Sequence, residues 1–299
     1  MTTLEAGTRI SLKNILFLTD FSEPSEAALP FAIGIARAYG AKTFALHVLR
    51  PDPLLYTTPA SVAVAQEAQE ETAKAEMQRI EAHLADVPHE TMMEWGIGVW
   101  PTIERAIKDK NIDFLVVGTH GRTGAQRLLL GSIAEEIFRR STVPVLTIGP
   151  AVPSGVHNGA RFHRVLFATD FSAHSLVAWP YALSLAQENQ ARLLLLHVIP
   201  KERASYEQKL GEISVASPQY RLNALLPKEA DFWCRPEAVV EEGDPATRIV
   251  TAAKERGADL IVLGVRNATK HLGAATHLER VTAHRVVANA KCPVLTVRG

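Results

Sequence analysis

The two halves of the sequence carry the same short motifs in the same order and at matching spacings. A collinear series of matches of this kind does not arise by chance, so the chain is a duplicated domain. We predict one domain over residues 1–150 and a second over residues 160–299, separated by a linker rich in Pro, Gly and polar residues. The matched segments are 15–22 with 165–172, 46–48 with 196–198, 112–118 with 258–264 and 143–148 with 292–297, and Pro30 matches Pro180.

Short apolar runs alternate with segments of helical periodicity in each half. Apolar runs of this kind are typical of strands buried on both faces, and their alternation with helices favours a parallel sheet. We therefore expect an α/β fold of two tandem Rossmann-like domains, with helices on both faces of each sheet. The first helix is expected to be bent at Pro30. The strands expected in the first half are 14–19, 43–49, 90–94, 113–117 and 143–148, and the helices between them include 22–39, 60–86, 100–110 and one that ends near Arg140.

A glycine-rich loop follows the fourth expected strand and ends where a helix begins, at Gly131-Ser132. Glycine lets the backbone approach a ligand closely, and a helix N-terminus offers amide N–H groups with a partial positive charge. We interpret the loop as a cradle for phosphate oxygens, with loop glycines that only turn the chain as the alternative. The loop lacks the lysine of a P-loop and the spacing of the dinucleotide fingerprint.

Ligands of such sheets bind at the carboxyl ends of the strands, where the strand order reverses. With a strand order of 3-2-1-4-5, Thr19-Asp20 and Gly118 become neighbours at that point. A carboxylate there suits a ribose hydroxyl or a cation. In the alternative interpretation Asp20 only shapes the turn before a helix, because Asp170 occupies the same place in the second half.

These motifs together resemble the universal stress protein family. The resemblance rests on Thr19-Asp20-Phe21-Ser22, on His47-Val48, and on Gly118-x2-Gly121 followed by nine residues and Gly131-Ser132. It covers nearly the whole chain as two copies. The family implies an adenine nucleotide alpha hydrolase-like fold, with a five-stranded parallel sheet of order 3-2-1-4-5 in each domain. Its ATP-binding branch carries the pattern G-x2-G-x9-G-S/T, which the first half matches without a gap.

Carried over by position, the resemblance implies an ATP site in the first half. Asp20, next to Thr19, would lie at the ribose, and Val48 would contact adenine through its backbone. Mg²⁺ bound with ATP is left open, and no residue is assigned as catalytic or as a protein ligand of a metal. The residues expected around the phosphates and ribose are Gly118, Thr119, His120, Gly121, Arg122, Thr123, Gly131, Ser132 and Ile133.

The second half departs from this pattern in its own loop. When the halves are aligned through Pro144 and Pro293, Arg280-Val281 stands in place of Gly131-Ser132, and the loop length changes. The arginine would occupy the phosphate space or pair with a different anion. We expect the second domain to have lost ATP, so that each chain binds one nucleotide.

The resemblance implies a stress-response protein that acts as a nucleotide-dependent regulator. The alternatives are a slow ATPase that uses the same site and a nucleotide-free dimerisation scaffold. The loop offers no lysine clamp and no obvious general base, which argues against fast catalysis. The apolar last strand of each half is the one through which such proteins commonly dimerise. We expect the two copies in one chain to pair through these strands, and a homodimer of chains is left open.

Composition excludes other classes of partner. Lys and Arg number 32, as do Asp and Glu, so the chain has no excess charge for binding nucleic acid or an anionic membrane. No apolar run reaches the roughly 18–20 residues that span a bilayer, and residues 1–13 lack an apolar signal core. The two cysteines, Cys234 and Cys292, give no disulfide framework and suit a cytoplasmic location.

Overall fold

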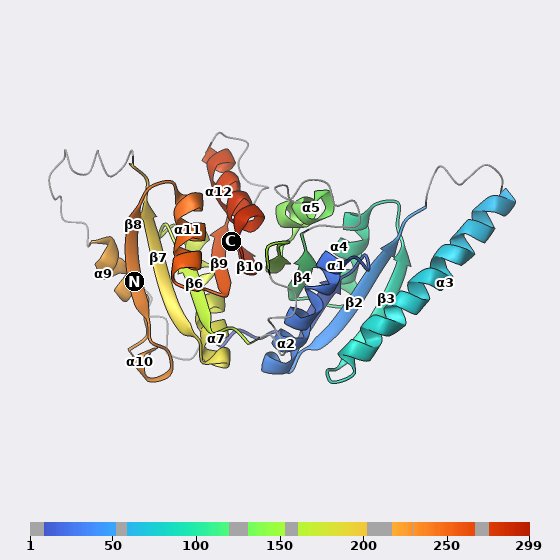
Figure 1. Ribbon diagram of the computed structural model, residues 1–299, viewed down its shortest axis with the longest axis horizontal. Coiled ribbons are helices and arrows are strands. Elements are labelled where there is room, and N and C mark those ends of the chain that lie inside the picture. The colour runs from blue at the N-terminus through green and yellow to red at the C-terminus, as the bar shows by residue number, and fades with distance from the viewer. Residues whose placement is uncertain are drawn as a thin grey trace.

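The computed structural model describes residues 9–51, 59–119, 131–152, 161–201, 217–228, 230–266 and 275–299, with the backbone alone for residues 59–61, 231, 233 and 275–281. Strands and helices alternate along both halves of the chain (Figure 1). The elements of the first half are β1 (Asn14–Leu18), α1 (Glu23–Glu26), α2 (Leu29–Tyr39), β2 (Lys42–Leu49), α3 (Pro59–Leu84), β3 (His89–Trp95), α4 (Val99–Asp109), β4 (Phe114–Gly118), α5 (Ser132–Arg140) and β5 (Val145–Ile148). Those of the second half are β6 (Arg164–Ala168), α6 (Ala173–Leu176), α7 (Trp179–Asn189), β7 (Arg192–Ile199), α9 (Pro218–Asn223), α10 (Ala230–Trp233), β8 (Glu237–Glu242), α11 (Pro245–Glu255), β9 (Leu260–Val265), α12 (Ala275–Asn289) and β10 (Val294–Arg298).

The strands form one 10-stranded sheet of order β3-β2-β1-β4-β5-β10-β9-β6-β7-β8. Each half contributes parallel strands in the order 3-2-1-4-5, so the predicted fold class is confirmed. The two five-stranded sheets are continuous, because the last strands β5 and β10 pair antiparallel and join the halves into a single sheet.

The junction of the halves explains why their last strands are so apolar. β5 and β10 would be sheet edges in isolated halves, and exposed edges invite uncontrolled pairing. Here Leu146 lies opposite Leu295, and both are buried. The buried hydroxyl of Thr147 donates to the carbonyl oxygen of Val294 at 2.9 Å, and that of Thr296 donates back to β5. Each copy therefore covers the edge of the other.

The first helical segment is broken in two rather than bent. α1 ends at Glu26 and α2 begins at Leu29, with Pro30 in the first turn of α2. Proline fits a first turn because its missing N–H would have no partner there. The second half repeats this arrangement, with Pro180 in the first turn of α7. The prediction of a bend at Pro30 was therefore wrong, and the matching prolines start a helix.

One face of the sheet carries a hydrophobic core that runs through both halves. The rings of Phe31 and Phe162 stack with their centroids 6.2 Å apart. Beside them the Tyr39 hydroxyl lies 2.9 Å from the Ser184 hydroxyl, where α2 and α7 meet (Figure 1). Burial raises the pKa of Tyr39 far above its usual value, so this phenol stays protonated.

On the opposite face the core is divided between the halves, and α5 contributes to both parts. Ile137 of α5 packs in the core of the first half. Ala134 and Phe138, on the same helix, pack in the core of the second half. The helix that follows the glycine-rich loop is therefore seated partly on the other domain.

Arg298 fastens the end of α5 to the second half. Its guanidinium donates from Nε to the carbonyl oxygen of Ser141 at 2.9 Å, and from Nη2 to that of Phe138. Nη1 donates to the carbonyl oxygen of Arg266 at 2.8 Å, at the end of β9. A cation at a helix C-terminus satisfies the last carbonyls and complements the helix dipole.

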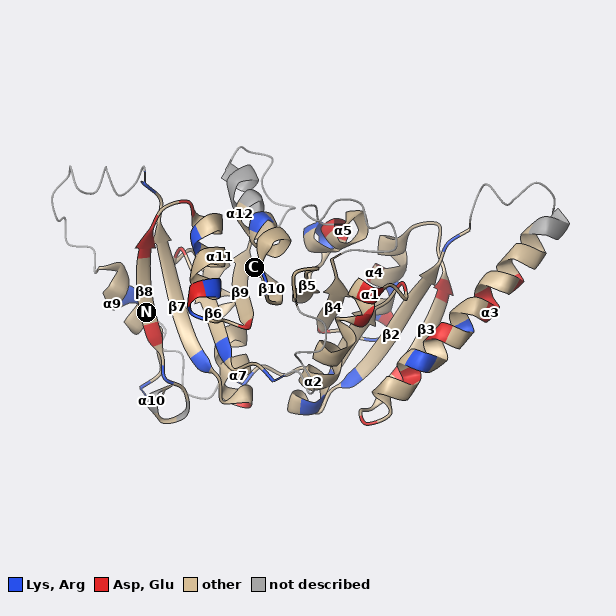
Figure 2. Cartoon of the chain, viewed as in Figure 1, with Lys and Arg blue, Asp and Glu red and all other residues tan. Residues whose placement is uncertain are grey.

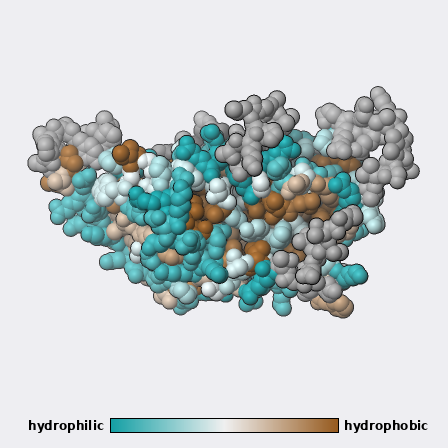
Figure 3. Space-filling model, turned by 180° about the vertical axis from the view of Figure 1, so that it is seen from behind, coloured by the Kyte–Doolittle hydropathy of each residue, from teal (hydrophilic) through white to brown (hydrophobic). Residues whose placement is uncertain are grey.

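The molecular surface mixes charges of both signs. Acidic and basic residues are interspersed along α3, the 26-residue helix at one end of the molecule (Figure 2). The reverse face is mostly hydrophilic, with hydrophobic residues gathered near its middle (Figure 3). In the described parts of the chain, no helix combines the length and apolar content that crossing a bilayer requires.

Replacing Arg298 with alanine should lower the free energy of unfolding by about 1–3 kcal/mol, because carbonyl groups of both halves lose a charged donor. Urea unfolding followed by circular dichroism measures this change. The control is Arg139→Ala, which removes an exposed arginine from α5, the helix that Arg298 contacts, and should change stability by less than about 0.5 kcal/mol. Equal effects of the two substitutions would contradict this role of Arg298.

Candidate functional site

The carboxyl edge of the first-half sheet brings several predicted residues together. Leu18, at the end of β1, lies opposite Leu46 of β2 and Val117 of β4. The chain that follows β1 therefore leaves the sheet between the ends of its two neighbours. This places Thr19 and Asp20 between Val48 on one side and Gly118-Thr119 on the other.

The glycine-rich loop is closed at its base by a backbone hydrogen bond. The amide of Gly131 donates to the carbonyl oxygen of Thr119 at 2.8 Å, so the end of β4 is joined to the start of α5. Gly131 is the N-cap of α5 and has no side chain with which to bond the first amides. Ser132 is exposed and Ile133 half-buried. The first turn of α5 thus offers amides that have no partner within the helix.

Four of the predicted site residues, His120, Gly121, Arg122 and Thr123, lie outside the described residues. Their assignment to the phosphate tail stays a prediction.

Asp20 shapes the turn between β1 and α1. Its Oδ1 accepts hydrogen bonds from the backbone amide of Ser22 at 3.1 Å and from the Ser22 hydroxyl. Between them Phe21 adopts a left-handed conformation with φ of 59°, which is uncommon for a residue with a large side chain. The Thr19 hydroxyl accepts from the Phe21 amide at 3.0 Å and supports the same turn.

The second half repeats this turn at Asp170. Its Oδ1 accepts from the Ser172 amide at 2.9 Å, and Phe171 has φ of 62°. Burial raises the pKa of Asp170, but hydrogen bonds from Ser172 and Ser175 outweigh it and hold the pKa below its usual value. The carboxylate is thus ionised in the domain whose loop departs from the ATP pattern, and the turn does not by itself indicate a ligand.

The matching histidines also have equivalent surroundings in both halves. Nδ1 of His47 lies 2.9 Å from the carbonyl oxygen of Thr19, and its ring stacks on Phe21 with centroids 4.2 Å apart. His197 makes the same bond to Thr169 at 2.8 Å. These contacts fasten the β1 turn to β2, and its equivalent to β7.

Gly118 and Gly264 are required by packing. A Cβ placed on Gly118 would lie 2.5 Å from the carbonyl oxygen of Pro24, and one on Gly264 would lie 2.1 Å from that of His174. In both cases the obstacle is the backbone of the short helix that crosses the end of the strand. The shared glycine therefore follows from close helix–strand packing, independent of any ligand.

Asp113 and Asp259 complete the set of shared residues. Asp113 accepts from the amide of Lys13 at 2.8 Å, and Asp259 from that of His163 at 2.7 Å. Each carboxylate thus anchors the entry to the first strand of its half. Because the motifs shared by both halves have structural roles, the second half serves as an internal control. Features found only in the first half are the better candidates for function.

The start of α5 is such a feature. Ser132 and Val281 stand at the same distance before Pro144 and Pro293, respectively. Ser132 is the first residue of α5, whereas α12 begins at Ala275, more than one turn before Val281. The second half therefore has helix interior at the position where the first half has a helix N-terminus.

Sequence reasoning missed the loop between β3 and α4, which borders Val48. A Cβ on Gly96 would lie 3.3 Å from Cγ1 of Val48, and Gly98 is the N-cap of α4. Between them Ile97 is fully exposed. The sequence signal that could have indicated this loop is a single apolar residue, Ile97, between two glycines. In the second half Asp244 directly follows the matching glycine and caps α11 by accepting from the Thr247 amide at 3.0 Å.

The sequence profile of the Universal stress protein family matches residues 11–149 and again residues 161–298. The chain belongs to the universal stress protein family. The family predicted from the sequence motifs is thereby confirmed, and the two matches show that the universal stress protein unit occurs in tandem.

Known universal stress proteins match the chain over one or both halves. One from Mycolicibacterium smegmatis is 28% identical over 299 residues, which cover 95% of this chain and 96% of that protein. One from Methanocaldococcus jannaschii is 31% identical over 139 residues, which cover 46% of this chain and 81% of that protein. The crystal structure of a universal stress protein from Archaeoglobus fulgidus, 22% identical, has a TM-score of 0.66 and covers 95% of this chain and 98% of its own. The last comparison supports the fold.

Replacing either Gly118 or Gly264 with alanine should destabilise the protein by about 1–3 kcal/mol, because the new Cβ meets backbone that cannot move freely. Chemical denaturation without any nucleotide measures both. Gly149→Ala is the matched control, since a Cβ there finds ordinary contacts at 3.7 Å, and it should be neutral or slightly stabilising. A large effect at Gly118 with none at Gly264 would contradict the packing explanation.

Proposed function

We propose that this tandem universal stress protein binds ATP in its first domain, residues 1–150, and acts as a nucleotide-dependent regulator in the cytoplasmic stress response. The observation that carries the proposal is the start of α5. Gly131 leaves the first amides of that helix without a capping side chain and is joined to Thr119 at the end of β4. The corresponding position of the second domain, residues 160–299, lies inside α12.

The neighbouring residues suit the remaining parts of ATP. Asp20 stands at the point where the strand order reverses, which is where a ribose is bound in such sheets. Val48 and the loop from Gly96 to Gly98 offer an apolar border for adenine on the adjacent strand ends. The loop residues His120, Gly121, Arg122 and Thr123 would complete the contacts to the phosphates.

Mg²⁺ enters this proposal only as the counter-ion of ATP. The described residues contain no group of three or more His, Cys, Asp or Glu side chains that could hold a metal ion. Phosphate oxygens are ligands that Mg²⁺ prefers, and the ion would reduce the charge on the polyphosphate.

Adenine nucleotides occur as ligands in the family. One universal stress protein structure was solved in complex with cAMP, and that protein is 22% identical to this chain over 46% of its length. Its TM-score of 0.33 is too low to identify the ligand of this chain. The preference for ATP therefore rests on the glycine pattern and on the start of α5.

In this proposal the pairing of β5 with β10 makes one chain an intramolecular pair of domains. A homodimer of two chains would then need another surface, because both last strands are already paired.

The nucleotide content of the purified protein tests the proposal. After denaturation, chromatography of the supernatant should show ATP at no more than one molecule per chain, and calorimetric titration of the emptied protein should give one site. ADP or AMP in its place would indicate slow hydrolysis. Absence of any nucleotide together with no binding in the titration would contradict the proposal and favour the scaffold.

Gly131→Arg should weaken ATP binding by about a hundredfold, because the side chain fills the space in front of the first amides of α5 and removes their charge-assisted bonds. The matched control is Arg280→Ala in the second half, which should leave the affinity and the single site unchanged. Thermal melting without nucleotide confirms that both variants fold. Full ATP retention by Gly131→Arg would remove this loop from the explanation.

A further inference from the structure

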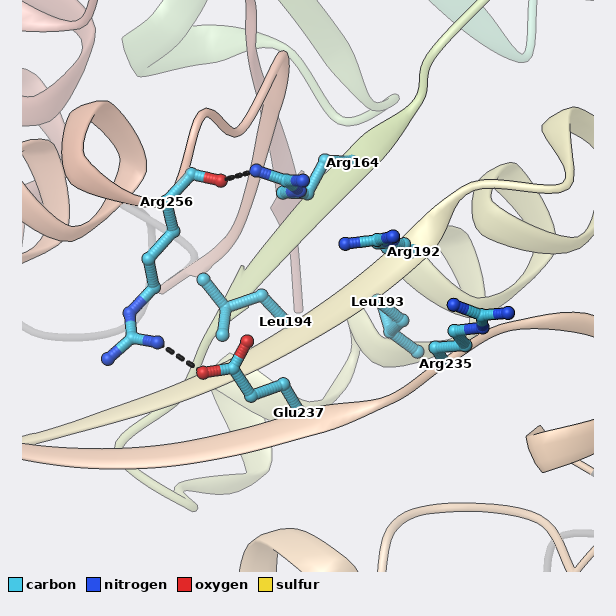
Figure 4. Close-up of a pocket in the computed structure, with 7 residues that line it drawn as sticks. All are labelled: Arg164, Arg192, Leu193, Leu194, Arg235, Glu237 and Arg256. Carbon is cyan, nitrogen blue, oxygen red and sulfur yellow. Dashed lines mark hydrogen bonds and ion pairs between the residues drawn. The ribbon is translucent and has the colours of Figure 1, made fainter.

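A second charged site lies in the second half, at the edge of the sheet opposite to the carboxyl ends of its strands. Arg164 begins β6, Arg192 begins β7, and Arg235 stands just before β8. Arg256 joins them from the end of α11. Together these segments line a cavity of about 350 Å³ that is open to solvent, where Arg192 and Arg235 are exposed (Figure 4). The lining residues are Arg164, Arg192, Leu193, Leu194, Arg235, Glu237 and Arg256.

The arginines of this cavity outnumber its carboxylates. Glu237 pairs with Arg256, whose Nη2 also lies 4.0 Å from Glu241. Arg164 donates to the main-chain carbonyl oxygen of Arg256, so its charge is not neutralised by that bond. Among the described residues, no carboxylate forms an ion pair with Arg164, Arg192 or Arg235. Among the residues drawn in Figure 4, a dashed line marks the ion pair of Arg256 with Glu237, and none joins a carboxylate to Arg164, Arg192 or Arg235.

The same edge of the first half provides an internal control, because there both cations are paired with a carboxylate. Lys42 and Lys110 both pair with Glu90, at 2.7 Å and 2.6 Å. These bonds hold the pKa of Glu90 below its usual value. The two ammonium groups also lie over the ring of Phe44, which fills the middle of the cluster.

The second half has replaced this closed cluster with an open one. By strand register, Arg192 takes the place of Lys42 and Leu194 that of Phe44. Arg164 takes the place of the uncharged Asn14. The exchange removes a bulky ring, adds positive charge and substitutes guanidinium groups for ammonium groups.

Like charges gathered around a cavity repel one another, and an anion would relieve that repulsion. Guanidinium groups match phosphate in geometry, because their planar fork can donate two parallel hydrogen bonds. Leu194, which lies opposite Glu237 in the strand register, gives the cavity one apolar wall, whereas Leu193 packs in the core on the other face of the sheet. A volume of this size is in the range of sites for small molecules.

We propose that this arginine cavity binds a small organic phosphate, with the phosphate among Arg164, Arg192 and Arg235 and the carbon skeleton against Leu194. The site is separate from the proposed ATP site, since it lies in the other half and at the opposite ends of the strands. It therefore stands whether or not the first domain binds ATP.

Calorimetric titration of the full chain with phenyl phosphate at low ionic strength tests the proposal. We expect one saturable site, and binding about tenfold or more weaker in the double variant Arg192→Gln with Arg235→Gln. The matched control, Lys74→Gln with Lys291→Gln, removes two exposed cations elsewhere and should bind as the unaltered chain does. Absence of saturable binding, or equal binding by both double variants, would overturn the proposal.

Two further arms separate the sources of binding. Inorganic phosphate should bind more weakly than phenyl phosphate, and equal affinity would overturn the assignment of the carbon skeleton to Leu194. The Gly131→Arg chain should bind phenyl phosphate unchanged, whereas loss of binding there would place the probe in the first half and overturn the proposed site. Without any anion, the arginine double variant should melt at the same or a higher temperature, because it removes repulsion between like charges.

Discussion

The pairing of β5 with β10 is the interaction on which the rest of the architecture depends. Two apolar strands that would each expose a row of unpaired amides and carbonyls satisfy one another instead, and their threonine hydroxyls add bonds across the junction. The pairing makes one sheet of two, brings the cores on one face into contact, and positions α5 over the boundary. The geometry of the candidate nucleotide site is therefore a property of both halves together.

The duplication separates residues that build the fold from residues that distinguish the domains. The β1 turn, the strand-end glycine and the anchoring aspartates recur with the same contacts, so they account for most of the visible sequence repeat. The remaining features, at the two edges of the sheet, differ between the halves. The first half has an open helix start at the carboxyl edge and a closed ion-paired cluster at the other edge. The second half has helix interior at the former position and an open arginine cavity at the latter. In our proposals each domain has kept or acquired a different anion site.

Much of this architecture could be predicted because it is encoded locally. The alternation of buried runs with helical segments gives the strand order once the family motifs are recognised, and Gly118 is visible as a strand-end glycine. The prediction of a bend at Pro30 was wrong because the break between α1 and α2 contains no glycine. Without such a signal, the sequence does not distinguish a proline inside a helix from one in its first turn. The arginine cavity could not be seen, since its residues come from four separate segments and meet only through strand register. The role of Arg298 could not be predicted either, because a single arginine near a strand end forms no recognisable sequence pattern.

The seating of α5 bears on how the two copies have evolved. After a duplication, a copy that loses its ligand is usually free to decay or be deleted. Here deletion of the second copy would expose Phe138, which packs against second-half residues. It would also remove the hydrogen bonds that Arg298 donates to the carbonyl groups at the end of α5. Natural selection that maintains the fold of the first copy therefore also preserves the second, because α5 packs on both.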